Sequence, residues 1–223
     1  MIIAIDGPSG VGKSTLGRAL ARRLGCAFVE SGAMYRAVGL KAIERGAAFS
    51  DAAAVSELAE ASDIRFVESP EGMRVHLDGR DVTERIRAAD VTDAASIVST
   101  IPRVRELMVA QQRTLGGSPR GVVLEGRDIG TVVFPQAAVK VYLDAETAVR
   151  GARRFQDGET SRQISESEVR EQLEERDRRD RTRHASPLKL ADGAVHVDTT
   201  RLTADEVLAR VWALVESAAA GKK

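Results

Sequence analysis

Residues Gly7-Pro8-Ser9-Gly10-Val11-Gly12-Lys13-Ser14-Thr15 match the complete pattern G-x-x-x-x-G-K-[ST] of a phosphate-binding loop. The apolar run at 2–5 before this loop is typical of a strand, and leucines recur at every fourth residue from 16 to 24 after it. This spacing predicts a helix, and Gly25 is placed to end it. A strand, a loop and a helix in this order form the context in which the pattern binds phosphate, so we expect a site for a nucleoside triphosphate.

The residue types in the loop suit that chemistry. Glycines let successive backbone N–H groups turn inward around an anion, and the N-terminus of the helix adds its positive dipole end. Lys13 is placed to reach the outer phosphates, and the Ser14 hydroxyl suits a Mg²⁺ ligand. The structural alternative is a glycine-rich turn that only joins a strand to a helix, and the flanking elements disfavour it.

The composition narrows the class of protein. The chain has 223 residues, 43% of them hydrophobic, which is enough for a core of ordinary size. Its 33 basic and 33 acidic residues cancel, which favours neither nucleic acid nor an anionic membrane as a partner. A single cysteine, Cys26, excludes an internal disulfide and suits a reducing compartment. Because no apolar run approaches a membrane span and little chain precedes the loop, we expect a cytoplasmic protein.

Further strand patterns alternate with helical segments. Apolar runs predict four more strands, at 27–30, 121–125, 139–144 and 194–198. Such alternation predicts an α/β fold with a parallel sheet covered by helices on both faces. Ser165 and Thr203 each precede a glutamate by three residues, and these capping boxes predict the starts of two helices.

Two segments interrupt the alternation. Period-two patterns at 64–68 and 73–77, with a possible short strand at 80–82, predict a small antiparallel sheet in a lobe that covers 31–100. The second segment, 146–183, holds basic residues, a loop with Gly158 and Ser161 and a highly charged helix, and its low apolar content predicts a mobile lid. The remaining core would consist of residues 1–30, 101–145 and 184–223.

The loop alone does not separate kinases from GTPases and ATP-driven motors. A GTPase reads guanine with an N-K-x-D segment, and this sequence contains no asparagine. A motor usually has adjacent Asp and Glu after an apolar strand, whereas residues 122–126 read Val-Val-Leu-Glu-Gly. A small kinase remains, with one insertion for an acceptor and one to cover the donor.

Three further segments point to a particular kinase family. They are Ser31-Gly32-Ala33-Met34-Tyr35-Arg36, Gly126-Arg127-Asp128-Ile129-Gly130-Thr131-Val132-Val133-Phe134-Pro135 and Arg176-Asp177-Arg178-Arg179-Asp180-Arg181-Thr182-Arg183. Together with Ser96 and Arg105, and in this order and spacing over nearly the whole chain, they resemble the bacterial cytidylate kinases. The resemblance implies a P-loop NTPase fold with an adenylate-kinase-like five-stranded parallel sheet, a lobe that binds the nucleoside monophosphate, and a mobile lid. It also implies transfer of the γ-phosphoryl group of ATP to CMP or dCMP by Mg²⁺-assisted in-line displacement.

The resemblance further implies residues that bind the acceptor: Ser31, Tyr35, Arg36, Ser96, Arg105, Arg127, Asp128, Arg176, Asp180 and Arg183. On the donor side it implies the phosphate loop and three arginines of the lid, Arg150, Arg153 and Arg154. Lys13, Arg36, Arg127 and Arg153 would neutralise the charge of the transferred group. We expect no general base, because the acceptor phosphate is already an anionic nucleophile.

The chemistry of cytosine agrees with the roles that the resemblance implies for Asp128 and Arg105. Cytosine presents an amino donor beside ring acceptors, which the Asp128 carboxylate and the Arg105 guanidinium complement. Uracil inverts both edge groups and would leave buried partners facing the wrong way.

Other interpretations stay open. Arg36 could lie on the surface of a core helix, and Asp128 could cap a turn. Arg178, Arg179 and Arg181 fit a solvated helical face better than a ligand role. Gly151 is unexpected in the helix that carries the lid arginines, because glycine costs about 1 kcal/mol relative to alanine there.

Two other functions compete. One is another small P-loop kinase that acts on UMP or on a non-nucleotide acceptor such as shikimate. The other is a nucleotide-sensing or RNA-binding protein that uses the arginine-rich segment. The zero net charge and the low aromatic content, 4%, argue against RNA. We expect a monomer, because no apolar stripe is left without a partner.

Overall fold

The computed structural model describes residues 1–69, 72–156 and 165–221. Its centre is a five-stranded parallel sheet with the strand order β2-β6-β1-β7-β8, which confirms the predicted α/β class. The strands coincide with the five apolar runs, and their bounds are Ile2–Asp6 (β1), Ala27–Glu30 (β2), Val122–Gly126 (β6), Val139–Asp144 (β7) and Val195–Asp198 (β8).

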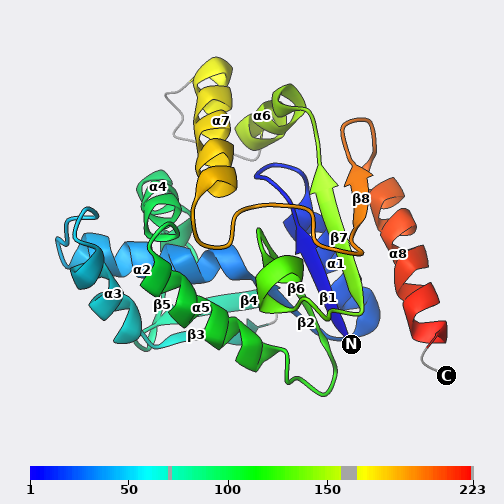
Figure 1. The fold of residues 1–223 in the computed structure, drawn as a ribbon, viewed down its shortest axis with the longest axis horizontal. Helices are drawn as coiled ribbons and strands as arrows, with labels where there is room; N and C mark the ends of the chain where they lie inside the picture. Colours follow the sequence, from blue (N-terminus) through cyan, green and yellow to red (C-terminus); the bar gives the residue numbers. More distant parts are fainter. Residues whose placement is uncertain (70–71, 157–164, 222–223) are drawn as a thin grey trace.

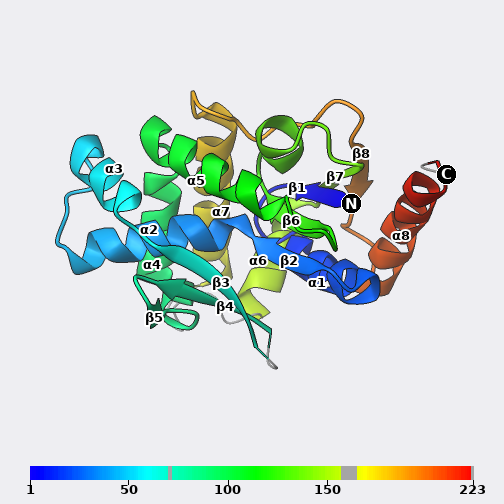
Figure 2. The ribbon, with the colours of Figure 1, turned by 90° about the horizontal axis from the view of Figure 1, so that it is seen from below.

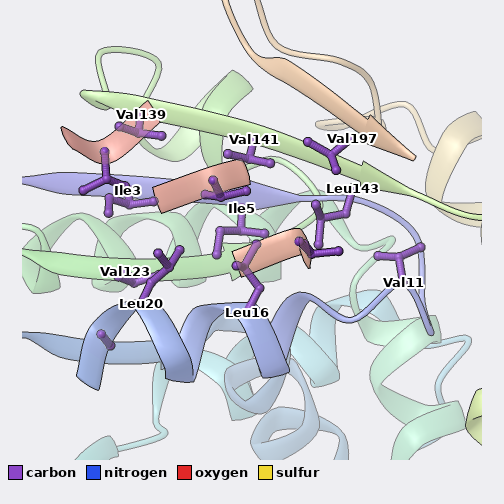
Figure 3. Packing of buried hydrophobic residues seen from close by; sticks show 14 of the residues in the cluster. Ile3, Ile5, Val11, Leu16, Leu20, Val123, Val139, Val141, Leu143 and Val197 are labelled. Carbon is purple, nitrogen blue, oxygen red and sulfur yellow. The ribbon is translucent and has the colours of Figure 1, made fainter. Parts of the chain in front are cut away.

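Helices cover both faces of this sheet (Figure 1). On one face α1 (Lys13–Leu24) and α8 (Ala204–Ala220) pack against Ile3 and Ile5 of β1. Figure 3 shows Leu16 and Leu20 of α1 turned toward these strand residues. On the other face Ala4 contributes to a second cluster, with α5 (Pro102–Leu115) and a turn of π-helix at Ile129–Val133. Full burial of each large aliphatic side chain contributes roughly 1.5–3 kcal/mol.

The predicted helix ends are present. Gly25 follows α1 with a left-handed φ of 64°, which glycine adopts without a Cβ penalty. Thr203 and Glu206 form the predicted capping box of α8. Ser165 and Glu168 do the same for α7 (Glu166–Thr182), so each helix begins where its sequence pattern places it.

A second, antiparallel sheet lies in the segment 31–100, in the order β3-β4-β5. Its strands are Ile64–Ser69 (β3), Gly72–Leu77 (β4) and Arg80–Asp81 (β5), and residues 70–71 of the predicted turn lie outside the described residues. Figure 2 shows this sheet beside α2 and far from α8. The helices of the segment are Ser31–Glu44 (α2), Ala52–Glu60 (α3) and Ala89–Val98 (α4), with a 3₁₀ turn at Arg85–Arg87.

Helices α6 (Thr147–Gln156) and α7 pack against each other beyond the tip of β7 (Figure 1). They carry the basic and charged segments expected of the lid. The predicted lid loop with Gly158 and Ser161 lies outside the described residues. In the described part of the chain, no helix is both long and apolar enough to cross a membrane.

Candidate active site

A cavity of about 750 Å³ opens where β1, β2 and β6 end. The carboxyl edge of a parallel sheet is where α/β proteins usually bind ligands, because loops from several strands meet there. The predicted donor residues in its wall are Ser9, Gly10, Val11, Gly12, Lys13, Ser14, Thr15, Arg153 and Arg154. The predicted acceptor residues in its wall are Ser31, Tyr35, Arg36, Ser96, Arg105, Arg127, Asp128, Arg176, Asp180 and Arg183.

Two predicted residues at the start of the loop lie outside the wall of this cavity, as far as the described residues define it. Gly7 has a φ of 147°, and a Cβ there would lie 2.1 Å from the Leu143 carbonyl oxygen. Glycine is therefore needed for the chain to pass β7 at this point. The Pro8 carbonyl oxygen accepts a hydrogen bond of 2.6 Å from Lys13 Nζ. Gly7 and Pro8 therefore fix the backbone of the loop and do not line the cavity that the described residues form.

Arg150 also lies outside the wall formed by the described residues, and its guanidinium binds protein groups. It forms an ion pair of 2.6 Å with Asp177 Oδ2 of α7 and donates to the Ser9 and Ala145 carbonyl oxygens over 3.2 and 3.0 Å. Arg150 thus joins the phosphate loop to α7. Its contact with the donor stays a prediction.

The other two arginines that we expect in the lid face the cavity from α6. Arg153 donates to the Thr199 carbonyl oxygen over 2.8 Å, which places it beside the loop after β8. Arg154 donates to Ser9 Oγ over 3.0 Å, at the rim of the phosphate loop.

Burial perturbs two groups at the foot of the phosphate loop. Burial and then the nearby Arg127 charge lower the pKa of Lys13 to about 7. Burial and then the Glu30 charge raise the pKa of Glu125 to about 7. Burial therefore disfavours both charged forms, and a bound polyanion would favour the charged form of Lys13.

Glu125 and Ser14 together suit a divalent cation. Ser14 Oγ donates to Glu125 Oε1 over 2.9 Å, and Glu125 Oε2 is buried with no hydrogen-bond partner among the described residues. No group of three or more His, Cys, Asp or Glu side chains in the described part of the chain could hold a metal ion. Mg²⁺ at a nucleotide needs only one or two protein oxygens, because phosphates and water supply the rest. The two side chains therefore fit this ion.

Several buried polar side chains lie around Arg105, which forms part of the cavity wall. Arg105 Nη2 donates to Asp128 Oδ2 over 2.5 Å and Nη1 to the Ser99 carbonyl oxygen over 3.1 Å. Its guanidinium lies 5.4 Å from the centre of the Tyr35 ring, within the range of a cation–π contact. Ser96 Oγ, also buried, has no hydrogen-bond partner among the described residues. A carboxylate, a guanidinium and an open hydroxyl thus meet where a base could bind.

Cations outnumber carboxylates between this group and the phosphate loop. Arg127 Nε donates to Asp180 Oδ2 over 2.7 Å, and Arg183 Nη1 lies 3.6 Å from Asp180 Oδ1. Burial and then the Arg127 charge lower the pKa of Arg176 to about 9. Arg36 Nη1 donates a long hydrogen bond, 3.5 Å, to the Ile86 carbonyl oxygen. Such an excess of positive charge in a cleft attracts polyanions.

Some residues of the cavity wall belong to none of the sequence motifs. Glu125 fits no motor motif, and its acidic side chain near the carboxyl end of the predicted strand β6 is the signal that could have identified it. Arg87 lies in a 3₁₀ turn without a motif. The apolar part of the wall comes from Leu202, just before α8, and from Leu208 within it. The solvated-face interpretation holds for Arg178, which is exposed and paired with Glu175.

Comparisons with known proteins agree with this geometry. A family model described as cytidylate kinase matches residues 3–217. The cytidylate kinase of Caldanaerobacter subterraneus subsp. tengcongensis is 42% identical over 99% of this chain and 96% of its own, and that of Rhodococcus jostii is 44% identical over 96% and 94%. A solved gluconokinase from Sinorhizobium meliloti gives a TM-score of 0.51, covering 97% of this chain and 92% of its own, and at 16% identity it supports the fold alone.

Proposed function

The chain belongs to the cytidylate kinase family and is a phosphotransferase that phosphorylates CMP with ATP, and we propose that the cavity at the carboxyl edge of the sheet binds both nucleotides at once. The observation that carries this proposal is that the phosphate loop and the predicted acceptor residues line one continuous cavity. The alternatives, a UMP or shikimate kinase and an RNA-binding protein, are not favoured.

The donor would lie along the phosphate loop. Backbone N–H groups of the loop and Lys13 would hold its β- and γ-phosphates, with Arg153 and Arg154 approaching from α6. Ser14 and Glu125 would hold Mg²⁺, which when bound neutralises charge on the phosphates. We propose that residues 146–183 form a lid that excludes water, because water would otherwise compete as the acceptor.

The acceptor would lie between the segment 31–100 and α7. Arg36 and Arg127 would clamp its phosphate, and Asp180 with Arg176 would contact the ribose. Ser96, Arg105 and Asp128 would read the cytosine edge, as their burial beside one another supports. We propose that dCMP is also accepted.

The transfer needs no covalent intermediate with the protein. An oxygen of the CMP phosphate attacks the γ-phosphorus of ATP, and the bond from that phosphorus to the β–γ bridging oxygen breaks, which gives CDP and ADP. Lys13, Arg36 and Arg127 stabilise the charge that develops on the transferred group. The contribution of the protein is to align the two nucleotides and to neutralise the charge on the transferred phosphoryl group.

A panel of acceptors tests this function. We expect ADP production with CMP and dCMP to exceed that with UMP, AMP and shikimate, measured as initial rates with ATP. A preference for UMP or shikimate would contradict the proposal. The monomeric state and the cytoplasmic location stay predictions, and sedimentation velocity checks the first.

A further inference from the structure

The carboxylate of Asp6 takes part in no step of the proposed transfer. It lies at the end of β1, it is 3% exposed, and it is absent from the cavity wall as the described residues form it. Its Oδ1 accepts a hydrogen bond of 2.8 Å from the Ile129 N–H, and its Oδ2 accepts one of 2.7 Å from the Gly130 N–H. Both oxygens therefore bind the backbone directly after Asp128.

Asp6 also meets the other flank of the same segment. In the parallel ladder between β1 and β6, Asp6 lies opposite Gly126, the last residue of β6. Arg127 and Asp128 therefore lie between two segments that Asp6 contacts. Asp6 pairs in the sheet with the residue before them, and its carboxylate binds the two residues after them.

The turn that follows explains why an outside acceptor is required. Residues Ile129–Val133 form one turn of π-helix, in which the Asp128 carbonyl oxygen accepts from the Val132 and Val133 N–H groups over 2.9 and 3.2 Å. The first N–H groups of any helical turn have no acceptor within it. Those of Ile129 and Gly130 are buried away from water, so the Asp6 carboxylate satisfies them.

We propose that Asp6 is a positioning residue for acceptor recognition, whose two oxygens hold the backbone so that Arg127 reaches the acceptor phosphate and Asp128 reaches the cytosine. The inference rests on the proposed roles of Arg127 and Asp128. Burial raises the pKa of Asp6 to about 6, against the opposing effect of its two N–H donors, so at neutral pH it is the carboxylate that accepts both hydrogen bonds.

The substitution Asp6→Asn tests this role, because an asparagine would turn its amide toward one of the two N–H donors. We expect kcat/KM for CMP to fall about 10²-fold, through KM and kcat together because both Asp128 and Arg127 would be displaced, since a misplacement of about 1 Å has that effect. We expect the KM for ATP to be unchanged and the preference for CMP over UMP to fall. Asp51→Asn is the matched control, because Asp51 Oδ1 also accepts a backbone N–H, that of Ala54 over 3.0 Å, far from the cavity.

A second variant disturbs the same contact from the other side and leaves the charge of Asp6 in place. A Cβ on Gly130 would lie 3.3 Å from Asp6 Oδ2 and 3.2 Å from Ala191 Cβ, so Gly130→Ala should displace the carboxylate slightly. We expect the same selective loss toward CMP, about 10-fold. If Asp6→Asn does not fold, as judged by thermal unfolding, the result with Gly130→Ala decides.

These outcomes distinguish a failure of the proposed role of Asp6 from a failure of the proposed function. Unchanged CMP kinetics in folded variants, or an equal loss toward ATP and CMP, would overturn the role of Asp6 while the wild-type protein still prefers CMP. A wild-type protein without that preference would instead overturn the proposed function itself.

Discussion

Arg105 Nη2 and Asp128 Oδ2 lie 2.5 Å apart, and their side chains are only 3% and 7% exposed. Because water is largely excluded, a base that offers the wrong edge would face one of these charged groups with a donor or acceptor that it cannot hydrogen-bond. Asp128→Asn should therefore lower kcat/KM for CMP by about 10²-fold and reduce the preference for CMP over UMP. Steady-state kinetics with both acceptors check this.

The control is a similar pair at the surface. Arg85 and Asp90 form an ion pair of 2.6 Å, but their side chains are 44% and 54% exposed. Asp90→Asn should change neither activity nor selectivity, because solvent screens the pair. Equal selectivity in Asp128→Asn and Asp90→Asn would contradict the assignment of Asp128 to the base.

Lys13 is the group that we expect to matter most for the rate of transfer. Lys13→Ala should lower kcat by about 10²- to 10³-fold, since it removes one fixed cation from the transferred phosphoryl group. The fold should be retained, because the buried ammonium is held by the Pro8 carbonyl oxygen of its own loop. Lys140→Ala serves as the control in the same assay, because this half-buried lysine also donates to a backbone carbonyl oxygen, that of Pro135 over 2.9 Å, and is absent from the cavity wall that the described residues form. Normal turnover in the Lys13 variant would exclude the proposed role.

The buried ion pair of Arg150 and Asp177 should stabilise the packing of α7 on the phosphate loop. Asp177→Ala leaves a buried guanidinium unpaired and should cost about 3–5 kcal/mol of unfolding free energy. Glu175→Ala on the same helix removes the surface ion pairs with Arg178 and Arg179 and should cost less than about 1 kcal/mol. Urea unfolding of both variants measures the difference, and equal effects would show that the buried pair is not needed.

The raised pKa of Glu125 predicts how stability depends on pH. A carboxyl that binds its proton more tightly when folded stabilises the protein fully below its ordinary pKa, 4.5, and loses this contribution as the pH rises through about 7. The lowered pKa of Lys13 acts above pH 7 and with the opposite sign, so it does not mask this range. Urea unfolding without nucleotide should show that Glu125→Gln gains stability relative to wild type between pH 4.5 and 7. A constant difference would contradict the shift.

Gly151 lies inside α6, where a Cβ would have room. Its nearest neighbour would be Arg170 Cβ, at 3.8 Å, which is an ordinary contact. Gly151→Ala should therefore stabilise the protein by about 0.5–1 kcal/mol, through the lower backbone entropy of alanine in the unfolded chain. Thermal unfolding should show a Tm higher by roughly 1–4 °C. A lower Tm would mean that the helices pack more closely than this distance allows.

The local features of the fold could be predicted from the sequence. Apolar runs, capping boxes at Ser165 and Thr203, and the glycine after α1 are encoded by neighbouring residues. The strand order is different, because the placement of β6 between β2 and β1 depends on contacts between segments far apart in the chain.

Among the residues of the site, too, some could be predicted from the sequence and others could not. Residues within the characteristic segments, such as Arg127 and Asp128, could be placed through the family resemblance. Asp6 and Glu125 could not, since their roles depend on which backbone and hydroxyl groups reach them in space. Spacing also cannot show which of three arginines on α6 turns toward Asp177 and which toward the cavity, because this depends on how α7 packs against it.

The position of the acceptor base is the most direct test of the account. A crystal structure of the protein with CMP and a non-hydrolysable ATP analogue would show it. We predict that cytosine contacts Ser96, Arg105 and Asp128, with the acceptor phosphate between Arg36 and Arg127. A base bound elsewhere, with those three side chains facing solvent, would contradict it.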